Sequence, residues 1–292
     1  MAVRLPFGNR VRRIAAATWR QNARSLRCPA TPRLDGKRAL VTGGNAGIGT
    51  AISRGLLARG AEVVSASRSA AKDAGVTLDL SDLRSVHEAS RVLAERHAPL
   101  DVVICNAGLW PQRYKTSAQG HELAFATNVL GHFTLLRDLI GARALAANAR
   151  VVILTGDIYV LASECTSDFA YQNALGGMQA YCRSKLGDIW IARELQRRHP
   201  ELHVAIAHPG VVATGLGGTP SPGVDRIRRS FILPIERGAE TSLFCATQPI
   251  AKGAYIHNTL GEVTFGRDDP GGDDASAERL WDLCEALSER MS

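Results

Sequence analysis

Short apolar segments rich in β-branched residues alternate with longer segments of helical periodicity from residue 38 to the end of the chain. The short segments predict strands and the longer ones predict helices. Strands are expected at residues 38–42, 61–67, 76–79, 100–105, 150–155, 202–207 and 254–257, and helices at residues 48–59, 83–96, 122–145, 179–198, 237–247 and 275–289. This alternation predicts an α/β fold, a single domain in which a doubly wound, Rossmann-type parallel sheet of about seven strands carries helices on both faces.

The net charge of +7 is concentrated at one end of the chain. Residues 1–34 contain eight arginines and no acidic residue, which leaves 27 basic against 28 acidic residues in the remainder. We therefore divide the sequence into a basic N-terminal arm, residues 1–34, and a nearly neutral main domain, residues 35–292. The charge is not accompanied by a recognition motif for nucleic acid, so no nucleic-acid partner is expected.

The basic arm is expected to be helical, because an imperfect apolar stripe faces its arginines. The stripe consists of Val11, Ile14, Ala15, Thr18, Trp19, Asn22 and Leu26. Three interpretations stay open: contact with an anionic membrane surface, a targeting presequence, or packing on the main domain.

Other features restrict the class of protein. The sequence has no apolar stretch that approaches eighteen residues, and its N-terminus is too rich in arginine for a secretory signal. A cytoplasmic location is expected, peripheral to a membrane if the arm binds lipid. Six scattered cysteines lack paired spacing, and His121, His132 and His208 lack the spacing of metal ligands, so no metal site is expected.

A glycine-rich loop follows the first predicted strand and opens the first helix of the main domain. Gly43 permits a tight turn, Gly47 lets the backbone approach a pyrophosphate, and Gly49 lets the helix pack close to the strand. Asn45 and Ile48 complete the loop. Because a helix N-terminus offers unpaired N–H donors, the loop predicts a dinucleotide site.

The end of the second strand indicates which dinucleotide binds. Ser67 and Arg68 stand where an NAD enzyme usually carries a carboxylate for the ribose diol. An arginine suits a 2′-phosphate through charge-assisted hydrogen bonds, with the serine as a second donor. NADP is therefore the expected cofactor, in preference to NAD.

Tyr181 and Lys185 lie four positions apart in a predicted helix, and therefore on one face. Free tyrosine has a pKa near 10, so a phenolate ready near pH 7 needs roughly 4 kcal/mol of differential stabilisation. A nearby ammonium supplies about one to three pKa units of it. The spacing thus fits a proton-handling pair.

With these residues in place, the chain resembles the short-chain dehydrogenase/reductase family from Leu34 to the C-terminus. The resemblance rests on the T-G-x-x-x-G-I-G loop at residues 42–49, the C-N-A-G segment at residues 105–108, Asn128, Tyr181 and Lys185. The segments at residues 128–133, 180–186 and 208–214 look most like the retinol dehydrogenase branch. The resemblance implies cofactor contacts from Asp79, Leu80, Asn106, Ala107, Gly108, Tyr181, Lys185, Pro209, Gly210, Val212 and Thr214, and Asn106 is also expected to bond backbone at the sheet end.

The family's catalytic tetrad is incomplete in this sequence. The resemblance implies that Asn128 supports the site, Tyr181 exchanges the proton, and Lys185 assists it and holds the ribose. The position of the carbonyl-polarising serine falls on Gly156. Thr155 is the preferred stand-in for the missing hydroxyl, although a core-facing threonine is an equal alternative, and Tyr159 and Ser163 are the other candidates.

These observations predict an oxidoreductase domain at residues 35–292 that transfers a hydride between NADP(H) and a small lipophilic carbonyl or alcohol. A mobile substrate loop is expected near residues 215–236, where glycine and proline follow a strand. The alternative is an NADP(H)-binding regulatory protein with little turnover, because Gly156 replaces the serine. A homo-oligomer stays open.

Overall fold

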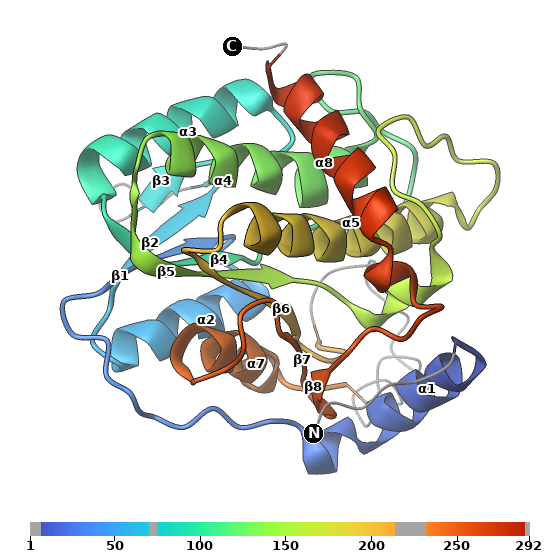
Figure 1. The fold of residues 1–292 in the computed structure, drawn as a ribbon, viewed down its shortest axis with the longest axis horizontal. Helices are drawn as coiled ribbons and strands as arrows, with labels where there is room; N and C mark the ends of the chain where they lie inside the picture. Colours follow the sequence, from blue (N-terminus) through green and yellow to red (C-terminus); the bar gives the residue numbers. More distant parts are fainter. Residues whose placement is uncertain (1–6, 70–74, 214–231, 290–292) are drawn as a thin grey trace.

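A computed structural model of the chain describes residues 7–69, 75–213 and 232–289. Within these ranges, eight strands form one sheet in the order β3-β2-β1-β4-β5-β6-β7-β8 (Figure 1). The strands are β1 (Arg38–Thr42), β2 (Glu62–Ser67), β3 (Gly75–Thr77), β4 (Leu100–Cys105), β5 (Leu145–Leu154), β6 (His203–His208), β7 (Tyr255–His257) and β8 (Gly261–Val263). All pairs are parallel except β7 with β8. The doubly wound α/β fold is thus confirmed.

Helices cover both faces of the sheet (Figure 1). On one face lie α3 (Leu83–His97), α4 (Gly131–Gly141) and α5 (Gly176–Arg198), with α8 (Asp274–Glu289) packed against α5, and on the other lie α2 (Gly47–Ala58) and α7 (Ile235–Thr247). Each face has its own core: in β1, Leu40 enters one, and Ala39 and Val41 enter the other. Because both faces are covered, the strands are apolar throughout rather than alternating.

The strand order places a crevice beside β1. The chain moves from β1 to β2 and β3 in one direction and then returns past β1 to β4 and β5 in the other. The connections that leave neighbouring strands therefore diverge at the carboxyl ends of β1 and β4, and this divergence leaves room for a ligand.

The region expected as one helix at residues 122–145 is built differently. A π-helix, η1 (Phe125–Leu130), precedes α4, which ends at Gly141, and β5 begins at Leu145. The amides of Arg143 and Ala144 bond the carbonyls of Ile140 and Leu139, and Arg143 has φ 53°. This is the Schellman arrangement that stops a helix, and its left-handed position is usually glycine. The expected helix was too long because an arginine occupies that position.

The basic arm contains the helix α1 (Phe7–Arg24), which lies beside the β8 edge of the molecule (Figure 1). Gln21 and Ser25 are buried, whereas Trp19, a member of the expected apolar stripe, is 70% exposed. The Gln21 amide donates to Val211 O (3.1 Å) and accepts from Val211 N (3.0 Å). The helix α1 therefore docks through polar side chains, and Leu26 and Cys28, which follow it, pack against the core. No helix in the described part of the chain is long and apolar enough to cross a membrane.

The expected substrate loop and one expected cofactor residue lie largely beyond the described chain. Residues 215–231 of the loop, and Thr214, are outside the described residues. At its far end, Leu233 bridges Val212, and α7 begins at Ile235. The two ends of the segment are therefore held together at the sheet edge.

Candidate active site

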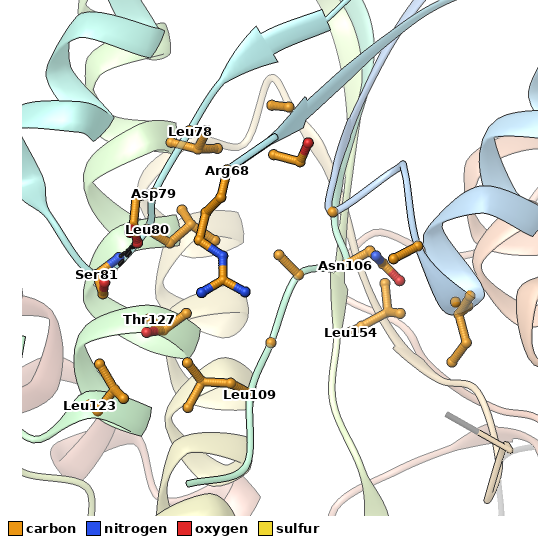
Figure 2. A pocket seen from close by; sticks show the side chains of 18 of the residues that line it. Arg68, Leu78, Asp79, Leu80, Ser81, Asn106, Leu109, Leu123, Thr127 and Leu154 are labelled. Carbon is orange, nitrogen blue, oxygen red and sulfur yellow. Dashed lines mark hydrogen bonds between the residues drawn. The ribbon is translucent and has the colours of Figure 1, made fainter. Parts of the chain in front are cut away.

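A cavity of about 690 Å³ opens at the carboxyl ends of the strands (Figure 2). Its walls come from the segments after β1, β2, β3, β4, β5 and β6, and from α5. Most of the residues expected to bind the cofactor or to act in catalysis line it. They are Gly43, Asn45, Gly47, Ile48, Ser67, Arg68, Asp79, Leu80, Asn106, Ala107, Gly108, Thr155, Tyr181, Lys185 and Pro209.

Four other expected residues stand behind the cavity wall: Gly49, Asn128, Gly210 and Val212. Gly49 is a packing position, because a Cβ atom there would meet Gly43 O at 2.1 Å. Gly210 has φ +84° and lies against Gln21 and Leu233. These residues shape the backbone that faces the cavity.

The glycine loop fits a pyrophosphate. Gly43 and Gly47 have φ values of 65° and 52°, in the left-handed region that favours glycine. The turn between them delivers the chain to the N-terminus of α2, where the first backbone N–H groups have no partner inside the helix. Anions bind such helix ends through these donors and through the helix dipole.

The far end of the cavity carries the residues expected at the adenosine. Figure 2 shows Arg68 extending from the end of β2 into the cavity, between the Leu78–Ser81 segment and the Asn106–Leu109 segment. The buried Ser67 hydroxyl has no hydrogen-bond partner among the residues that the structure describes. Asp79 accepts bonds from the Ser81 amide and hydroxyl (2.9 and 2.7 Å), which fixes the neighbouring turn.

The ends of β1 and β4 are joined by a buried polar network. The Asn106 amide donates to Thr42 O (2.9 Å), as expected of a residue that bonds backbone at the sheet end. The Thr42 hydroxyl accepts hydrogen bonds from the backbone N–H groups of Asn106 and Ala107 (3.0 Å each). It also lies 2.9 Å from His132 Nε2. His132 Nδ1 lies 3.0 Å from the carbonyl of Asn128, so this nitrogen carries the ring proton. Burial lowers the pKa of His132 to about 4, and the ring is neutral at pH 7.

Asn128 lies in the π-helix η1 and connects three segments. Its side-chain oxygen accepts from Leu109 N (2.9 Å), and its amide donates to Leu109 O (3.0 Å) and to Ser184 Oγ (2.8 Å). One extra residue per turn in a π-helix commonly redirects a functional side chain. Asn128 thus ties the segment after β4 to α5, the helix that carries Tyr181.

Tyr181 and Lys185 lie on one face of α5, as their spacing predicts. The Lys185 ammonium is 5.6 Å from the centre of the Tyr181 ring and donates to Leu154 O (3.1 Å). The ring of Trp110 stacks on Tyr181, with 5.2 Å between centroids. Burial raises the pKa of Tyr181, and the charge of Lys185 opposes that rise.

Sequence reasoning missed the partner of Lys185. Asp188 accepts from the Lys185 ammonium at 2.7 Å, and both side chains are buried. Burial opposes the charge on Lys185, but the contacts with Asp188 and Tyr181 outweigh it and raise its pKa. Burial raises the pKa of Asp188 to about 6, with Lys185 opposing the rise. The three-residue spacing from the lysine was the available signal for this pair.

The candidates for the missing hydroxyl are all directed elsewhere. Thr155 is buried and donates to Lys185 O (2.8 Å), Tyr159 donates to Asp269 (3.2 Å), and Ser163 is exposed. At Gly156 the backbone is extended, and a Cβ atom would have as its nearest neighbours Ile158 at 3.9 Å and Lys185 at 4.0 Å. A serine therefore fits at this position without displacing its surroundings.

A buried cluster of Asp157, His208 and His257 lies directly behind this position, and the sequence analysis missed it. Asp157 Oδ2 is 2.7 Å from His257 Nε2 and 3.5 Å from His208 Nε2, and Tyr255 donates to Oδ1 (2.8 Å). Burial opposes ionisation of Asp157, but the two histidines and Tyr255 outweigh it and lower its pKa. The cluster joins the ends of β5, β6 and β7.

The hydrogen bonds of this cluster bear on the expectation of no metal site. His257 Nδ1 accepts from the amides of Thr259 and Leu260 (2.9 and 3.3 Å), so Nε2 carries the proton and donates it to Asp157. A metal-binding histidine normally donates from its second nitrogen, which these amides prevent. The cluster is therefore explained as a hydrogen-bonded anchor rather than as a set of metal ligands.

Comparison with known proteins agrees with this geometry. A family model for short chain dehydrogenases matches residues 37–223. Human retinol dehydrogenase 14 is 29% identical, with 87% of each chain covered, and human retinol dehydrogenase 12 is 31% identical, with 90% of each chain covered.

Solved structures share the fold. An uncharacterised protein from Mycobacterium paratuberculosis matches with a TM-score of 0.68 at 27% identity, over 90% of this chain and 98% of its own. A short chain dehydrogenase from Burkholderia cenocepacia J2315 in complex with NADP matches with a TM-score of 0.63 at 24% identity, over 79% and 99%. The chain therefore belongs to the short-chain dehydrogenase/reductase family, in the branch that includes the retinol dehydrogenases.

Proposed function

We propose that the protein transfers a hydride between NADP(H) and a lipophilic carbonyl or alcohol, with Tyr181 as general acid or base and Lys185 as its partner. The family assignment makes the chain an oxidoreductase that uses a nicotinamide cofactor. The observation that carries the finer proposal is that both residues line the same cavity as the phosphate loop.

The preference for NADP rests on the end of β2. Arg68 reaches into the cavity from this end (Figure 2). The hydroxyl of Ser67, the preceding residue, has no partner within the described ranges. A guanidinium and a hydroxyl together match the oxygens of a 2′-phosphate. Arg68→Ala is expected to weaken NADPH binding at least tenfold and to leave NADH binding unchanged. Equal losses for both cofactors in a fluorescence titration would contradict the assignment.

Side chains of this protein give and take the proton that the reaction requires. When bound, the nicotinamide supplies or accepts the hydride. In reduction, the Tyr181 hydroxyl gives its proton to the carbonyl oxygen, and in oxidation its phenolate takes the proton of the alcohol. The Lys185 charge stabilises the phenolate, and Asn128 holds α5 against the segment after β4.

The aromatic side chains behind Tyr181 support a lipophilic substrate. Trp110 stacks on Tyr181, and Tyr114 meets Tyr171 edge to face nearby along the same segment. Relatives at about the 30% level are named as retinol dehydrogenases. NADPH oxidation over retinoid, steroid, aliphatic and quinone carbonyls tests the proposal. It fails if the protein neither binds NADPH nor oxidises it with any of these compounds.

The regulatory alternative is favoured by one observation, the commitment of the Thr155 hydroxyl to Lys185 O. Loss of one donor to a developing oxyanion costs about a hundred- to a thousandfold in rate. The Gly156→Ser variant distinguishes the two functions, since the added Cβ would make only ordinary contacts with Ile158 at 3.9 Å and Lys185 at 4.0 Å. An enzyme is expected to gain at least tenfold in kcat, whereas a regulator binds NADPH equally well and stays inactive in both forms.

We also propose that the arm contacts an anionic membrane surface. Trp19 is 70% exposed, and Arg12, Arg20 and Arg24 on the same helix are exposed as well. An aromatic ring beside basic side chains suits the lipid interface. Trp19→Ser should reduce binding to vesicles that contain phosphatidylserine, measured by sedimentation. Unchanged binding, or equal binding to neutral vesicles, would contradict this contact.

A further inference from the structure

Tyr181, Lys185 and Asp188 occupy one face of α5, at positions i, i+4 and i+7. The Lys185 ammonium lies between the other two groups. It is 2.7 Å from the Asp188 carboxylate but 5.6 Å from the centre of the Tyr181 ring. The cation that assists the tyrosine is therefore bound directly to an anion.

Because Lys185 and Asp188 are buried, their charges interact strongly. The side chains of Lys185 and Asp188 are 8% and 3% exposed, so solvent screens them little. The remaining contact that fixes the ammonium is its hydrogen bond to Leu154 O. With one N–H group held by Asp188 of α5 and another by Leu154 O of β5, the ammonium has a defined position relative to Tyr181.

The other titratable groups around the pair are uncharged near pH 7. Cys182 on α5, Cys105 on β4 and Cys165 in the segment before α5 are thiols whose pKa values are raised by burial. His132 on α4 faces Lys185 and is neutral, because burial lowers its pKa to about 4. Among the described residues, the charge near Tyr181 is therefore set by Lys185 and Asp188.

We propose that Asp188 is a positioning residue that holds the Lys185 ammonium and offsets part of its charge, so that Tyr181 remains protonated and the site favours carbonyl reduction at neutral pH. This inference rests on the proposed function. In reduction, the hydride from NADPH bonds to the carbonyl carbon as the C=O π bond breaks. The O–H bond of Tyr181 breaks at the same time, and its proton joins the carbonyl oxygen. NADPH becomes NADP⁺, the carbonyl becomes an alcohol, and the phenolate regains a proton from solvent.

Asp188→Asn tests the inference, because the amide keeps the size and an acceptor oxygen but removes the charge. Without the carboxylate, no anion offsets the Lys185 ammonium, so the Tyr181 phenolate forms more readily over the pH range in which Lys185 is protonated. In a plot of kcat for reduction against pH, the decline in rate at high pH should begin about 0.5 to 1 pH unit lower than in wild type. The rising limb for alcohol oxidation should move in the same direction. Asp188→Glu, which restores the charge, should return both limbs toward the wild-type positions.

Glu194→Gln is the matched control, since Glu194 is a buried acid of the same helix that pairs with Arg197 and Arg198 instead. The pH dependence of kcat for this variant should coincide with that of wild type, for both reduction and oxidation. An Asp188→Asn enzyme that keeps the wild-type limbs would overturn the inference. If that variant does not fold, Asp188→Ser, which retains a hydroxyl acceptor, replaces it in the same measurements.

A spectroscopic titration separates this inference from the proposed function. Phenolate absorbance is followed against pH with NADP⁺ present, and the curve of Tyr181→Phe is subtracted. The Tyr181 midpoint should be lower in Asp188→Asn than in wild type, even if no carbonyl is turned over. A lower midpoint in an inactive protein would refute the proposed function alone, whereas equal midpoints would refute the role of Asp188.

Discussion

The part of the molecule proposed to bind the cofactor, at the ends of β1, β2 and β4 (the cofactor half), differs in construction from the part proposed to bind the substrate, at the ends of β5, β6 and β7 (the substrate half). In the cofactor half, Asn45 bonds Ser69 and Asn106 bonds Thr42, contacts that span 24 and 64 positions of the chain. In the substrate half, Gln21 bonds Val211 across 190 positions and Asp157 bonds His257 across 100. Both halves are assembled by folding, but the residues of the cofactor half belong to short motifs, whereas those of the substrate half do not.

This difference determines which parts of the site can be recognised in the sequence. Dinucleotide binding needs a particular backbone geometry, and this geometry requires glycines at fixed spacing. The cofactor half can therefore be recognised from a short stretch of sequence. The polar anchors of the substrate half, such as Asp157 and His257, lie at no fixed spacing in the sequence. Changes in the cofactor half should therefore abolish binding, whereas changes in the substrate half should adjust stability and selectivity.

The largest effect is expected from Gly49→Ala in the cofactor half. The new Cβ would lie 2.1 Å from Gly43 O, a backbone atom that cannot move without opening the loop. NADPH affinity should fall at least 100-fold, or about 2.7 kcal/mol, in a fluorescence titration. Gly141→Ala is the control, because a Cβ there meets nothing within 4 Å. Equal NADPH affinities for the two variants would contradict the claim that Gly49 must pack closely against Gly43 for the loop to bind NADPH.

Acid should destabilise both halves through their buried histidines. Burial lowers the pKa of His132, in the cofactor half, and of His208, in the substrate half, from 6.5 to about 4. The unfolded chain therefore binds more protons between these values, and stability falls as pH decreases from about 6.5 to about 4, by up to about 3 kcal/mol for each histidine. Asp188, with its pKa raised to about 6, acts in the opposite direction and offsets part of the loss.

Single variants isolate the two contributions. Thermal melting of His132→Gln and of His208→Gln from pH 7 to pH 4 should show a smaller loss of Tm than wild type does. A loss of Tm identical to that of wild type in both variants would mean that neither histidine is neutral in the folded protein.

A smaller effect is expected from Gln21→Ala, which breaks the contact between the arm and the substrate half. Losing its two hydrogen bonds to Val211 should cost about 1 to 3 kcal/mol of stability. Because Val211 follows Pro209, which lines the cavity, KM for the carbonyl should rise while NADPH affinity stays the same.

Gln248→Ala is the matched control for this variant. Gln248 bonds Thr31 O at 2.5 Å, at the other end of the arm and away from the cavity. Its KM should be that of wild type. If Gln21→Ala weakens NADPH binding and leaves KM unchanged, the division of the cleft into two halves is wrong.

Sequence patterns predicted the sheet, the loop between β1 and α2, and the shared face of Tyr181 and Lys185, because these depend on local signals. The glycines between β1 and α2, the apolar strands and the spacing of Tyr181 and Lys185 are each visible within a few residues. The end of α4 was missed because Arg143 occupies a left-handed position that usually carries glycine. Strand β8 was missed because it has three residues and is defined by its antiparallel partner, β7.

The polar anchors of the substrate half could not be predicted for a different reason. Asp157 follows β5, and His208 and His257 are the last residues of β6 and β7, so only the strand order places the three side chains together. Gln21 belongs to the arm, where a polar residue between arginines carries no signal of burial, yet its side chain is 1% exposed. Such contacts follow from the fold rather than from a motif.

The transfer of a proton by Tyr181 in an NADPH-dependent carbonyl reduction can be measured by single-turnover reduction in Tyr181→Phe. Tyr114→Phe serves as the control, because Tyr114 is 49% exposed and packs on Tyr171 rather than on Lys185. Tyr181→Phe should bind NADPH as wild type does and lose at least about 100-fold in rate, whereas Tyr114→Phe should retain activity. Turnover at the wild-type rate by Tyr181→Phe would contradict the account.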